Sequence, residues 1–389
     1  MNGRQSSPNG NGNGEHPLSL NGNGKHAHAG TKRILVTGAA GAPALGYVRS
    51  LRKSGETFHL IGVDCNKYQL LAAETDERYL VPRASDPSYI PVLRDLIAET
   101  GAQLLFAQPD VEITVISRHR EELGVKTFLP PHETITLCQD KYKSFDRWQA
   151  AGLPVPETRL LHDATDLRSA LADFGDTWVR AAEGAAGRGS LHTSDYDQAL
   201  AWIDSHHGWG TFTAARYLSP RSVTWQSIWH NGELIVAQGR ERLQWEFADR
   251  APSGVTGITG AGITVRDEQV DETAQRAILA IDSKPHGIFA VDMTRDSAGV
   301  PNPTEINIGR FFTTTLFFTF AGLNMPHIYT KLAFGEKPDI PEPRLNPVEP
   351  GLLWVRGMDR EPMLAKVWQA DAAERALAER TNRLRKKIA

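Results

Sequence analysis

Short apolar runs alternate with helically spaced segments from residue 31 to about residue 130, and this alternation leaves few folds open. Three of the runs predict strands, and two amphipathic segments predict helices between them. In chain order these elements are Arg33–Thr37, Ala44–Lys53, His59–Val63, Tyr89–Glu99 and Gln103–Ala107. Strands that alternate with helices pair in parallel and carry helices on both faces. Residues 31–130 are therefore predicted to form a doubly wound α/β domain.

The character of the sequence changes after residue 130, and 389 residues leave room for a second domain. A helix is expected from about Thr134 to Ala150. Strands follow, and Asn231-Gly232 between two apolar runs is a strong hairpin signal. Residues 131–340 are thus predicted to form an α+β domain with antiparallel strand pairs.

The two ends of the chain differ from these domains in composition. Residues 1–30 alternate Asn and Gly without an apolar run, which predicts a disordered tail rather than a signal peptide. Residues 341–389 begin Pro-rich and are expected to be helical from about Pro362. The most apolar stretch, Phe311–Leu323, is too short to cross a bilayer and is expected to be soluble core.

Charge and cysteine content exclude several functional classes. The formal net charge of −3 predicts no affinity for nucleic acid or an anionic membrane. Two cysteines, Cys65 and Cys138, are too few for a disulfide framework or a four-ligand zinc site. These features predict a cytoplasmic protein that acts on small molecules.

The turn Thr37–Gly41 follows the first predicted strand, and Asp64 ends the second, as in dinucleotide-binding domains. The third glycine of that fingerprint, however, is replaced by Ala44. No tyrosine is followed four residues later by lysine, the pair that short-chain epimerases use for proton transfer. An NAD site is therefore one alternative, and binding of a carboxylate or phosphate by backbone N–H groups of the turn is another.

A second glycine-rich segment, Gly184–Ser190, nearly spells a Walker A loop but lacks its lysine. It follows Arg180 at the end of a predicted strand. A glycine hairpin of this kind can fold over phosphates, because its N–H groups and a nearby arginine supply positive charge. An ordinary surface loop is an equally open interpretation.

Residues 287–307 have the pattern of a β-hairpin with oxygen-bearing side chains on one face. Because side chains alternate along a strand, Glu305 and Asn307 share a face, and a turn at 296–301 places Asp292 opposite Glu305. Ligands of this kind suit Mg²⁺, which takes further ligands from nucleotide phosphates. The competing interpretation is a polar, solvated sheet face.

Four features in this order resemble the ATP-grasp superfamily. They are Lys141 in Cys-Gln-Asp-Lys-Tyr-Lys, a helix ending Ala-Gly-Leu-Pro-Val-Pro-Glu-Thr, Arg180 before the glycine loop, and Asp292 with Glu-Ile-Asn. Residues 305–336 are similar to the synthetase domains of the carbamoyl-phosphate synthase large subunit. The resemblance spans residues 31–340 and implies a two-lobed ATP-grasp fold behind a pre-ATP-grasp domain.

The resemblance also implies roles for the matching residues. Lys141 and Arg180 would hold the phosphates of ATP, and Asp292, Glu305 and Asn307 would be ligands of Mg²⁺. The loop that would close over the phosphates contains Glu183, Gly187, Arg188, Gly189 and Ser190.

The sequence departs from the family pattern at two places. The adenine hinge usually carries glutamates, whereas here the backbone of Ala215, Arg216 and Tyr217 would have to read the base. Ser222 stands where a ribose-binding glutamate is expected. The catalytic arginine of Glu-x-Asn-x-Arg comes one residue late, at Arg310.

A substrate site is expected where arginines precede a Gly/Thr-rich turn. The candidates are Arg240, Arg242, Arg250 and Ser253. Arginine pairs carboxylates and phosphates bidentately, which favours an acidic small molecule. Surface arginines beside a flexible loop are the alternative.

Together these patterns predict an ATP- and Mg²⁺-dependent ligase that activates a carboxylate as an acyl phosphate and joins it to an amine or ammonia. Three alternatives stay open. One is an enzyme that releases an acyl or carbamoyl phosphate, one is an NAD-dependent epimerase or dehydrogenase, and one is a nucleotide-binding regulator without turnover. A homodimer is expected because dimers are the commonest oligomers.

Overall fold

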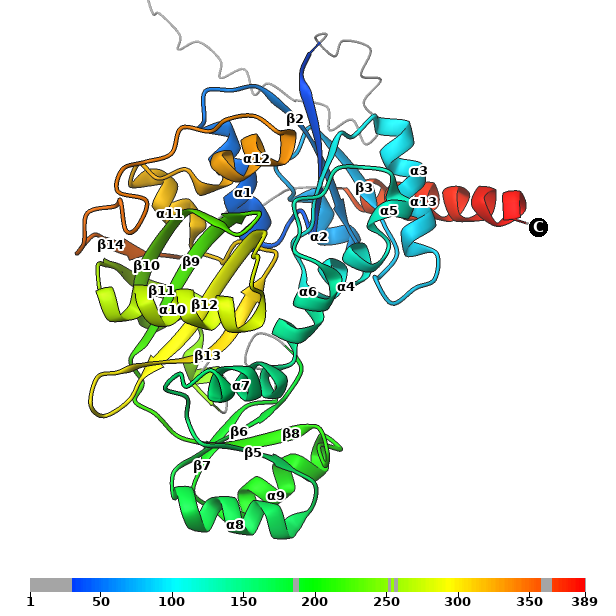
Figure 1. Cartoon of the computed structure of the whole chain (residues 1–389). Coiled ribbons are helices and arrows are strands. Elements are labelled where there is room, and N and C mark those ends of the chain that lie inside the picture. Colours follow the sequence, from blue (N-terminus) through cyan, green and yellow to red (C-terminus); the bar gives the residue numbers. More distant parts are fainter. Residues whose placement is uncertain (1–29, 185–188, 251–252, 255–257, 358–365, 389) are drawn as a thin grey trace, which may run out of the picture.

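The computed structural model describes residues 30–184, 189–250, 253–254, 258–357 and 366–388. These residues form an N-terminal lobe, a central lobe and a small lobe at the far end of the molecule (Figure 1). The predicted disordered tail, apart from Gly30, lies outside the described residues. No helix among those described is long and apolar enough to cross a membrane.

The N-terminal lobe is built on a four-stranded parallel sheet in the order β3-β2-β1-β4. Its strands are β1 (Lys32–Thr37), β2 (Phe58–Asp64), β3 (Glu77–Leu80) and β4 (Leu104–Phe106). Ile34 and Val36 pack with helix α1 (Ala42–Arg52), whereas Leu35 between them packs with α3 (Tyr89–Thr100). Helices therefore cover both faces, and the doubly wound prediction is confirmed.

Short helices complete this lobe and lead into the next. They are α2 (Lys67–Leu71), α4 (Asp110–Arg118), α5 (Arg120–Leu123), α6 (His132–Gln139) and α7 (Lys141–Ala150). The single helix predicted over 134–150 is wrong, because Asp140 divides it into α6 and α7. The Asp140 carboxylate accepts hydrogen bonds from the N–H groups of Tyr142 and Lys143, so it caps a new helix that begins at Lys141.

The central lobe contains a six-stranded antiparallel sheet in the order β13-β12-β9-β10-β11-β14. The strands are β9 (Ser222–His230), β10 (Glu233–Trp245), β11 (Thr259–Val265), β12 (Gly287–Arg295), β13 (Pro301–Ile308) and β14 (Leu353–Val355). The predicted hairpin at Asn231-Gly232 joins β9 to β10, and both residues have positive φ. Because β14 completes this sheet, the boundary predicted at residue 340 does not separate the Pro-rich segment from it.

The two faces of the central sheet differ in what covers them. One face, with Trp225 and Phe289, packs against α10 (Glu268–Ile281), α6 and α7. The other face buries Ile228 and Ile288 against α1, α11 (Thr315–Phe320) and α12 (Met325–Phe334). Most apolar residues of 311–323 lie in this second core, as predicted, although Phe320 is exposed. Nearer the small lobe, the second face becomes polar.

The small lobe is a four-stranded sheet in the order β5-β8-β6-β7, covered on one face by two helices. Its elements are β5 (Thr158–Leu161), α8 (Ala164–Phe174), β6 (Thr177–Ala181), β7 (Leu191–Thr193), α9 (Tyr196–Ser205) and β8 (Phe212–Arg216). Val179 and Ala214 pack under the helices, so Arg180, which lies between Val179 and Ala181 on β6, points to the open face.

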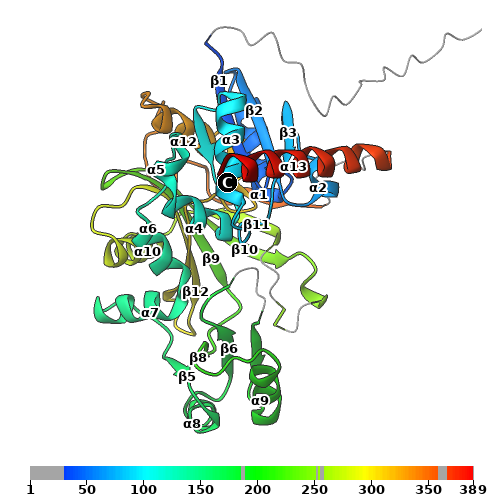
Figure 2. The same ribbon diagram turned by 90° about the vertical axis from the view of Figure 1, so that its right-hand side faces the viewer.

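The C-terminal helix α13 (Val367–Ile388) returns to the N-terminal lobe and lies across α2, β3 and α3 (Figure 2). Arg380 pairs with Asp95 and Glu99 of α3. The predicted C-terminal helix is confirmed, and its basic residues are in part used in docking it.

Candidate active site

A row of paired residues crosses the polar face of the central sheet. Glu305 pairs with Asp292, Asp292 with Thr224, and Thr224 with Arg240. Directly paired residues on neighbouring strands point to the same face, so these four side chains stand in line. The predicted opposition of Asp292 and Glu305 is confirmed.

Asn307 joins the two carboxylates into one cluster. Its Nδ2 donates to Asp292 Oδ2 at 3.0 Å and to Glu305 Oε1 at 3.4 Å. The Thr224 hydroxyl donates to the other oxygen of Asp292. The three oxygen-bearing side chains expected from the hairpin therefore converge.

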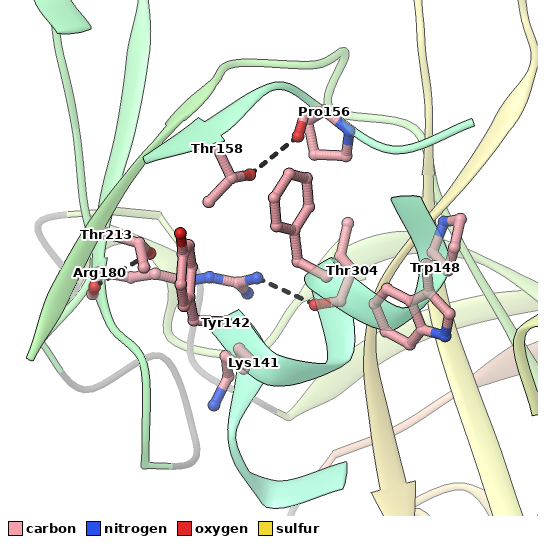
Figure 3. Close-up of a pocket in the computed structure, with 10 residues that line it drawn as sticks. Lys141, Tyr142, Trp148, Pro156, Thr158, Arg180, Thr213 and Thr304 are labelled. Carbon is pink, nitrogen blue, oxygen red and sulfur yellow. Dashed lines mark hydrogen bonds between the residues drawn. The ribbon is translucent and has the colours of Figure 1, made fainter. Parts of the chain in front are cut away.

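Two cations approach this cluster from other elements. Figure 3 shows both of them, Lys141 and Arg180, in the pocket that Thr304 also lines. Lys141, the first residue of α7, places Nζ 3.8 Å from Glu305 Oε2 and donates to the Gly184 carbonyl oxygen at 2.6 Å. Arg180 reaches from β6 to the Thr304 carbonyl oxygen at 2.9 Å, next to Glu305 in the chain. Both residues line a cavity, with Tyr142, Phe145, Trp148, Pro156, Thr158, Thr213, Pro303 and Thr304.

The pKa values of Glu305 and Lys141 are both lowered, but for different reasons. Burial alone would raise the pKa of Glu305, but the charges of Lys141 and Arg180 outweigh it and hold that pKa below its usual value. Burial lowers the pKa of the Lys141 amine, although Glu305 partly opposes this effect. Glu305 is thus an ionised carboxylate held among cations.

Arg310 reaches the cluster despite its shifted position in the sequence. Gly309, the extra residue, has φ +72° and its N–H donates to the Ile288 carbonyl oxygen at 2.8 Å. This left-handed residue follows the end of β13 and brings the Arg310 side chain back to Asn307, whose Oδ1 lies 2.5 Å from Nη2. The one-residue delay is therefore absorbed by a glycine.

The sequence interpretation missed Asp110, which holds Arg310 in place. Asp110 begins α4 in the N-terminal lobe, and its carboxylate binds the guanidinium through Nε at 2.5 Å and Nη2 at 3.1 Å. This bidentate pair joins the two lobes and supports a raised pKa of Arg310. The available signal was its place just after β4, because ligands of parallel sheets gather at the carboxyl ends of strands.

The donor set fits Mg²⁺ in the type of its atoms. Two carboxylates and one amide oxygen match a cation that usually takes one or two protein carboxylates plus substrate phosphates. The Oδ1 of Asn307 already accepts from Arg310, so binding a metal would require it to share that oxygen. Among the described residues, no group of three His, Cys, Asp or Glu side chains could hold a metal.

The proposed hinge for adenine has fewer free backbone groups than the sequence suggested. The N–H of Arg216 donates to the Glu157 carbonyl oxygen, and that of Tyr217 donates to the Asp176 carbonyl oxygen. Ala215 is buried within β8, between β5 and β6. Reading of an adenine edge here would therefore depend on carbonyl groups.

Arg242 connects Ser222 to the carboxylate cluster. The Ser222 hydroxyl accepts from Arg242 Nη1 at 2.7 Å, and Arg242 Nη2 lies 3.8 Å from Asp292 Oδ1. Arg242 also stacks on Trp245, with 3.5 Å between its guanidinium carbon and the ring centroid. Ser222 is thus engaged by an arginine in this structure.

The remaining predicted residues lie farther along two loops. Glu183 is exposed, Gly189 is partly buried and Ser190 is buried. Gly187 and Arg188 lie outside the described residues. Arg250 ends a short 3₁₀ helix, η1 (Ala248–Arg250), and its side chain is not among those described. Ser253 is partly buried.

Comparisons with known proteins agree with this arrangement. Residues 34–128 match the family described as PylC-like, N-terminal domain. No curated protein matches the chain by sequence.

Solved structures resemble most of the chain at low sequence identity. Biotin carboxylase from Campylobacter jejuni, solved as a β,γ-ATP complex, is 19% identical with a TM-score of 0.64, covering 83% of this chain and 74% of that one. L-amino acid ligase from Bacillus licheniformis is 13% identical with a TM-score of 0.59, covering 78% and 74%.

N5-carboxyaminoimidazole synthase from Aspergillus clavatus, with ADP and 5-aminoimidazole ribonucleotide, is 14% identical with a TM-score of 0.63, covering 90% and 87%. The order of the three lobes and the strand pairing around residues 292 and 305 agree with the predicted architecture. The chain has the ATP-grasp fold, preceded by a parallel-sheet domain that matches the PylC-like N-terminal family.

Proposed function

We propose that this protein is an ATP- and Mg²⁺-dependent ligase that activates a carboxylate as an acyl phosphate and joins it to an amine or ammonia. One observation carries the proposal: Lys141 and Arg180 enter the same cavity and stand beside the Asp292–Glu305–Asn307 cluster. This pairing of cations with metal-binding oxygens suits a nucleotide triphosphate. The ATP-grasp fold of structures solved with ATP analogues or ADP supports it.

Each residue near the cluster has a place in such a reaction. Lys141 and Arg180 would orient the β- and γ-phosphates, and Arg310 would neutralise charge on the transferring phosphoryl group. Asp292, Glu305 and Asn307 would hold Mg²⁺, which would supply further neutralisation of the phosphate charge. Positioning and charge then account for most of the catalysis, so no protein nucleophile is required.

The proposed chemistry has two steps. An oxygen of the substrate carboxylate attacks the γ-phosphorus, the bond from that phosphorus to the β–γ bridging oxygen breaks, and ADP leaves. The nitrogen of a neutral amine then attacks the acyl carbon, inorganic phosphate leaves, and the nitrogen loses a proton. Exclusion of water from the site would protect the acyl phosphate between the two steps.

The fate of the acyl phosphate separates this reaction from its nearest alternative. An enzyme that releases acyl or carbamoyl phosphate would use the same cluster and cations. The shifted position of Arg310 was one reason to consider a regulator without turnover. Because Arg310 contacts Asn307 of the cluster, that reason no longer favours the regulator. Synthesis of an amide therefore remains the proposal, with acyl phosphate release as an outcome of the test.

The test is incubation of the full chain with Mg-ATP and pooled carboxylates and amines, followed by measurement of ADP and phosphate. We expect release that requires both Mg²⁺ and an acid, with ¹⁸O from labelled carboxylate appearing in phosphate. Glu305→Gln is the matched control, because it keeps the shape of the side chain while removing its charge. Release without label transfer, or equal release by Glu305→Gln, would contradict the mechanism.

The finer predictions belong to this proposal as well. The substrates would be a small acid and a small amine, and similarity to the carbamoyl-phosphate synthase domains stays a prediction. A cytoplasmic location and a homodimer also stay predictions. Size-exclusion chromatography with light scattering measures the oligomeric state directly.

A further inference from the structure

Arg240 is a fully enclosed cation with unused hydrogen-bond donors. Its side chain belongs to a residue only 2% exposed, and neither Nε nor Nη1 has a partner within the part of the chain that the structure describes. The guanidinium carbon lies 4.8 Å from the centroid of the Phe312 ring. Burial and the charge of Arg242 lower the pKa of Arg240 to about 9. A charged group in this position lacks the hydrogen bonds that normally offset its desolvation.

Gln226 lies near Arg240 and also has buried polar atoms without hydrogen-bond partners among the described residues. It pairs with Gln238 on β10, two residues from Arg240 on the same face of the sheet. Gln226 is fully buried, and both its amide nitrogen and its amide oxygen are without partners among the described residues. Gln238, in contrast, accepts from the Val348 N–H and donates to the Gly239 carbonyl oxygen. Gln226 and Arg240 therefore lack partners, within the described part of the chain, at a place on the sheet where the neighbouring Gln238 has them.

Asp292 does not satisfy Arg240. Its oxygens accept hydrogen bonds from Thr224 and Asn307, and its nearest guanidinium is that of Arg242, at 3.8 Å. In the proposed reaction Asp292 would also be a ligand of Mg²⁺, so its negative charge would be neutralised by the metal. No carboxylate among the described residues therefore pairs with Arg240.

We propose that Arg240 and Gln226 bind a second, unreactive carboxylate of a substrate, together with an amino or hydroxyl group beside that carboxylate. Arg240 would pair the carboxylate, and the Gln226 amide oxygen would accept from the neighbouring donor. An amino acid or hydroxy acid has this chemistry. The inference rests on the proposed function and specifies the substrate class.

The row across the sheet explains why this carboxylate is not the one that is phosphorylated. Arg240 lies two strands from Asp292, which at about 4.8 Å per strand is roughly 10 Å. The reacting carboxylate has to meet the γ-phosphate at the other end of the row, near Glu305 and Lys141. Arg240 is therefore a specificity residue that anchors the distal end of the substrate.

The probes are L-amino acids and the α-carboxamides of the same amino acids. Each is added to the full chain with Mg-ATP and a pool of simple monocarboxylates and amines, and ADP release is measured. We expect at least one amino acid to stimulate release and its carboxamide to have a KM about 30-fold higher, because a charged hydrogen bond is lost. Omitting the acid pool or the amine pool shows whether that amino acid is the amine or the acid substrate.

Variants test whether Arg240 and Gln226 are responsible. Arg240→Lys and Arg240→Met should raise the KM for the amino acid by about 30-fold or more, while the KM for ATP stays within about twofold. Gln226→Glu supplies an internal counter-charge, so it should raise Tm and weaken the amino acid at the same time. A purely structural role for Arg240 would give the higher Tm with an unchanged KM. Arg221→Met, which removes an exposed guanidinium, is the control.

The outcomes separate this inference from the proposed function. If the wild-type chain turns over but carboxamides equal the acids, or the Arg240 and Gln226 variants keep the wild-type KM, the anchoring site is wrong and the ligase function stands. If no combination gives ADP, calorimetry with the same amino acids decides. Binding that Gln226→Glu abolishes would keep the anion site, and no binding would overturn both.

Discussion

Gly309 offers a sharp test of how the displaced arginine is brought into the site. A Cβ atom at Gly309 would lie 3.1 Å from Leu129 Cδ2 and 3.3 Å from Ile113 Cγ2, and both neighbours are buried. The residue also has φ +72°, which an L-residue adopts at a cost of about 1–2 kcal/mol. Crowding of a packed core typically adds roughly 1–3 kcal/mol. Gly309→Ala is therefore expected to lower the free energy of unfolding by about 2–5 kcal/mol.

Gly299→Ala is the matched control on the same hairpin. Gly299 has φ +85°, but a Cβ atom there would meet nothing within 4 Å. This variant should show only the backbone cost of about 1–2 kcal/mol. The difference between the two variants isolates the contact with Leu129 and Ile113.

Urea unfolding and steady-state kinetics of both variants complete the test. Relief of the crowding at Gly309→Ala would move Arg310 from Asn307, and a shift of about 1 Å is expected to lower kcat about 100-fold. Gly299→Ala should retain the wild-type kcat. Equal losses of stability would refute the packing argument, and an unchanged kcat in folded Gly309→Ala would refute the need to place Arg310 through this glycine.

Other expectations follow from the same site and from one buried carboxyl group. Asp292→Asn and Glu305→Gln should each abolish ADP release while circular dichroism shows a retained fold; wild-type rates would remove the metal assignment. Asp110→Asn should lower kcat about 100-fold with the KM for ATP little changed, because Arg310 loses its bidentate partner. Glu112 is a pH probe, because burial raises its pKa from 4.5 to about 7. The unfolded carboxyl ionises first, so stability should fall by up to about 3 kcal/mol between pH 4.5 and 7, and denaturant unfolding of Glu112→Gln should lack that part of the loss.

Local patterns in the sequence were sufficient for elements whose partners are close in the chain. The alternating segments of 31–130 specify a doubly wound sheet because each strand is short, apolar and followed by a helix. The pairing of Asp292 with Glu305 follows from a turn only a few residues away, which fixes the register of the two strands. The break at Asp140 was missed, because a capping side chain outweighed a continuous helical pattern.

Only the tertiary structure decided which distant groups meet. Asp110 and Arg310 are separated by 200 residues, and no local pattern links the start of α4 to the end of β13. The compensation at Gly309 depends on Ile113 and Leu129, which come from the N-terminal lobe and its connection. The unpartnered donors of Arg240 likewise depend on what β9, β11 and Phe312 place around it. The sequence alone determined which side chains could carry phosphate chemistry, because residue type and strand period are local, whereas packing between lobes determined their partners, charges and free donors.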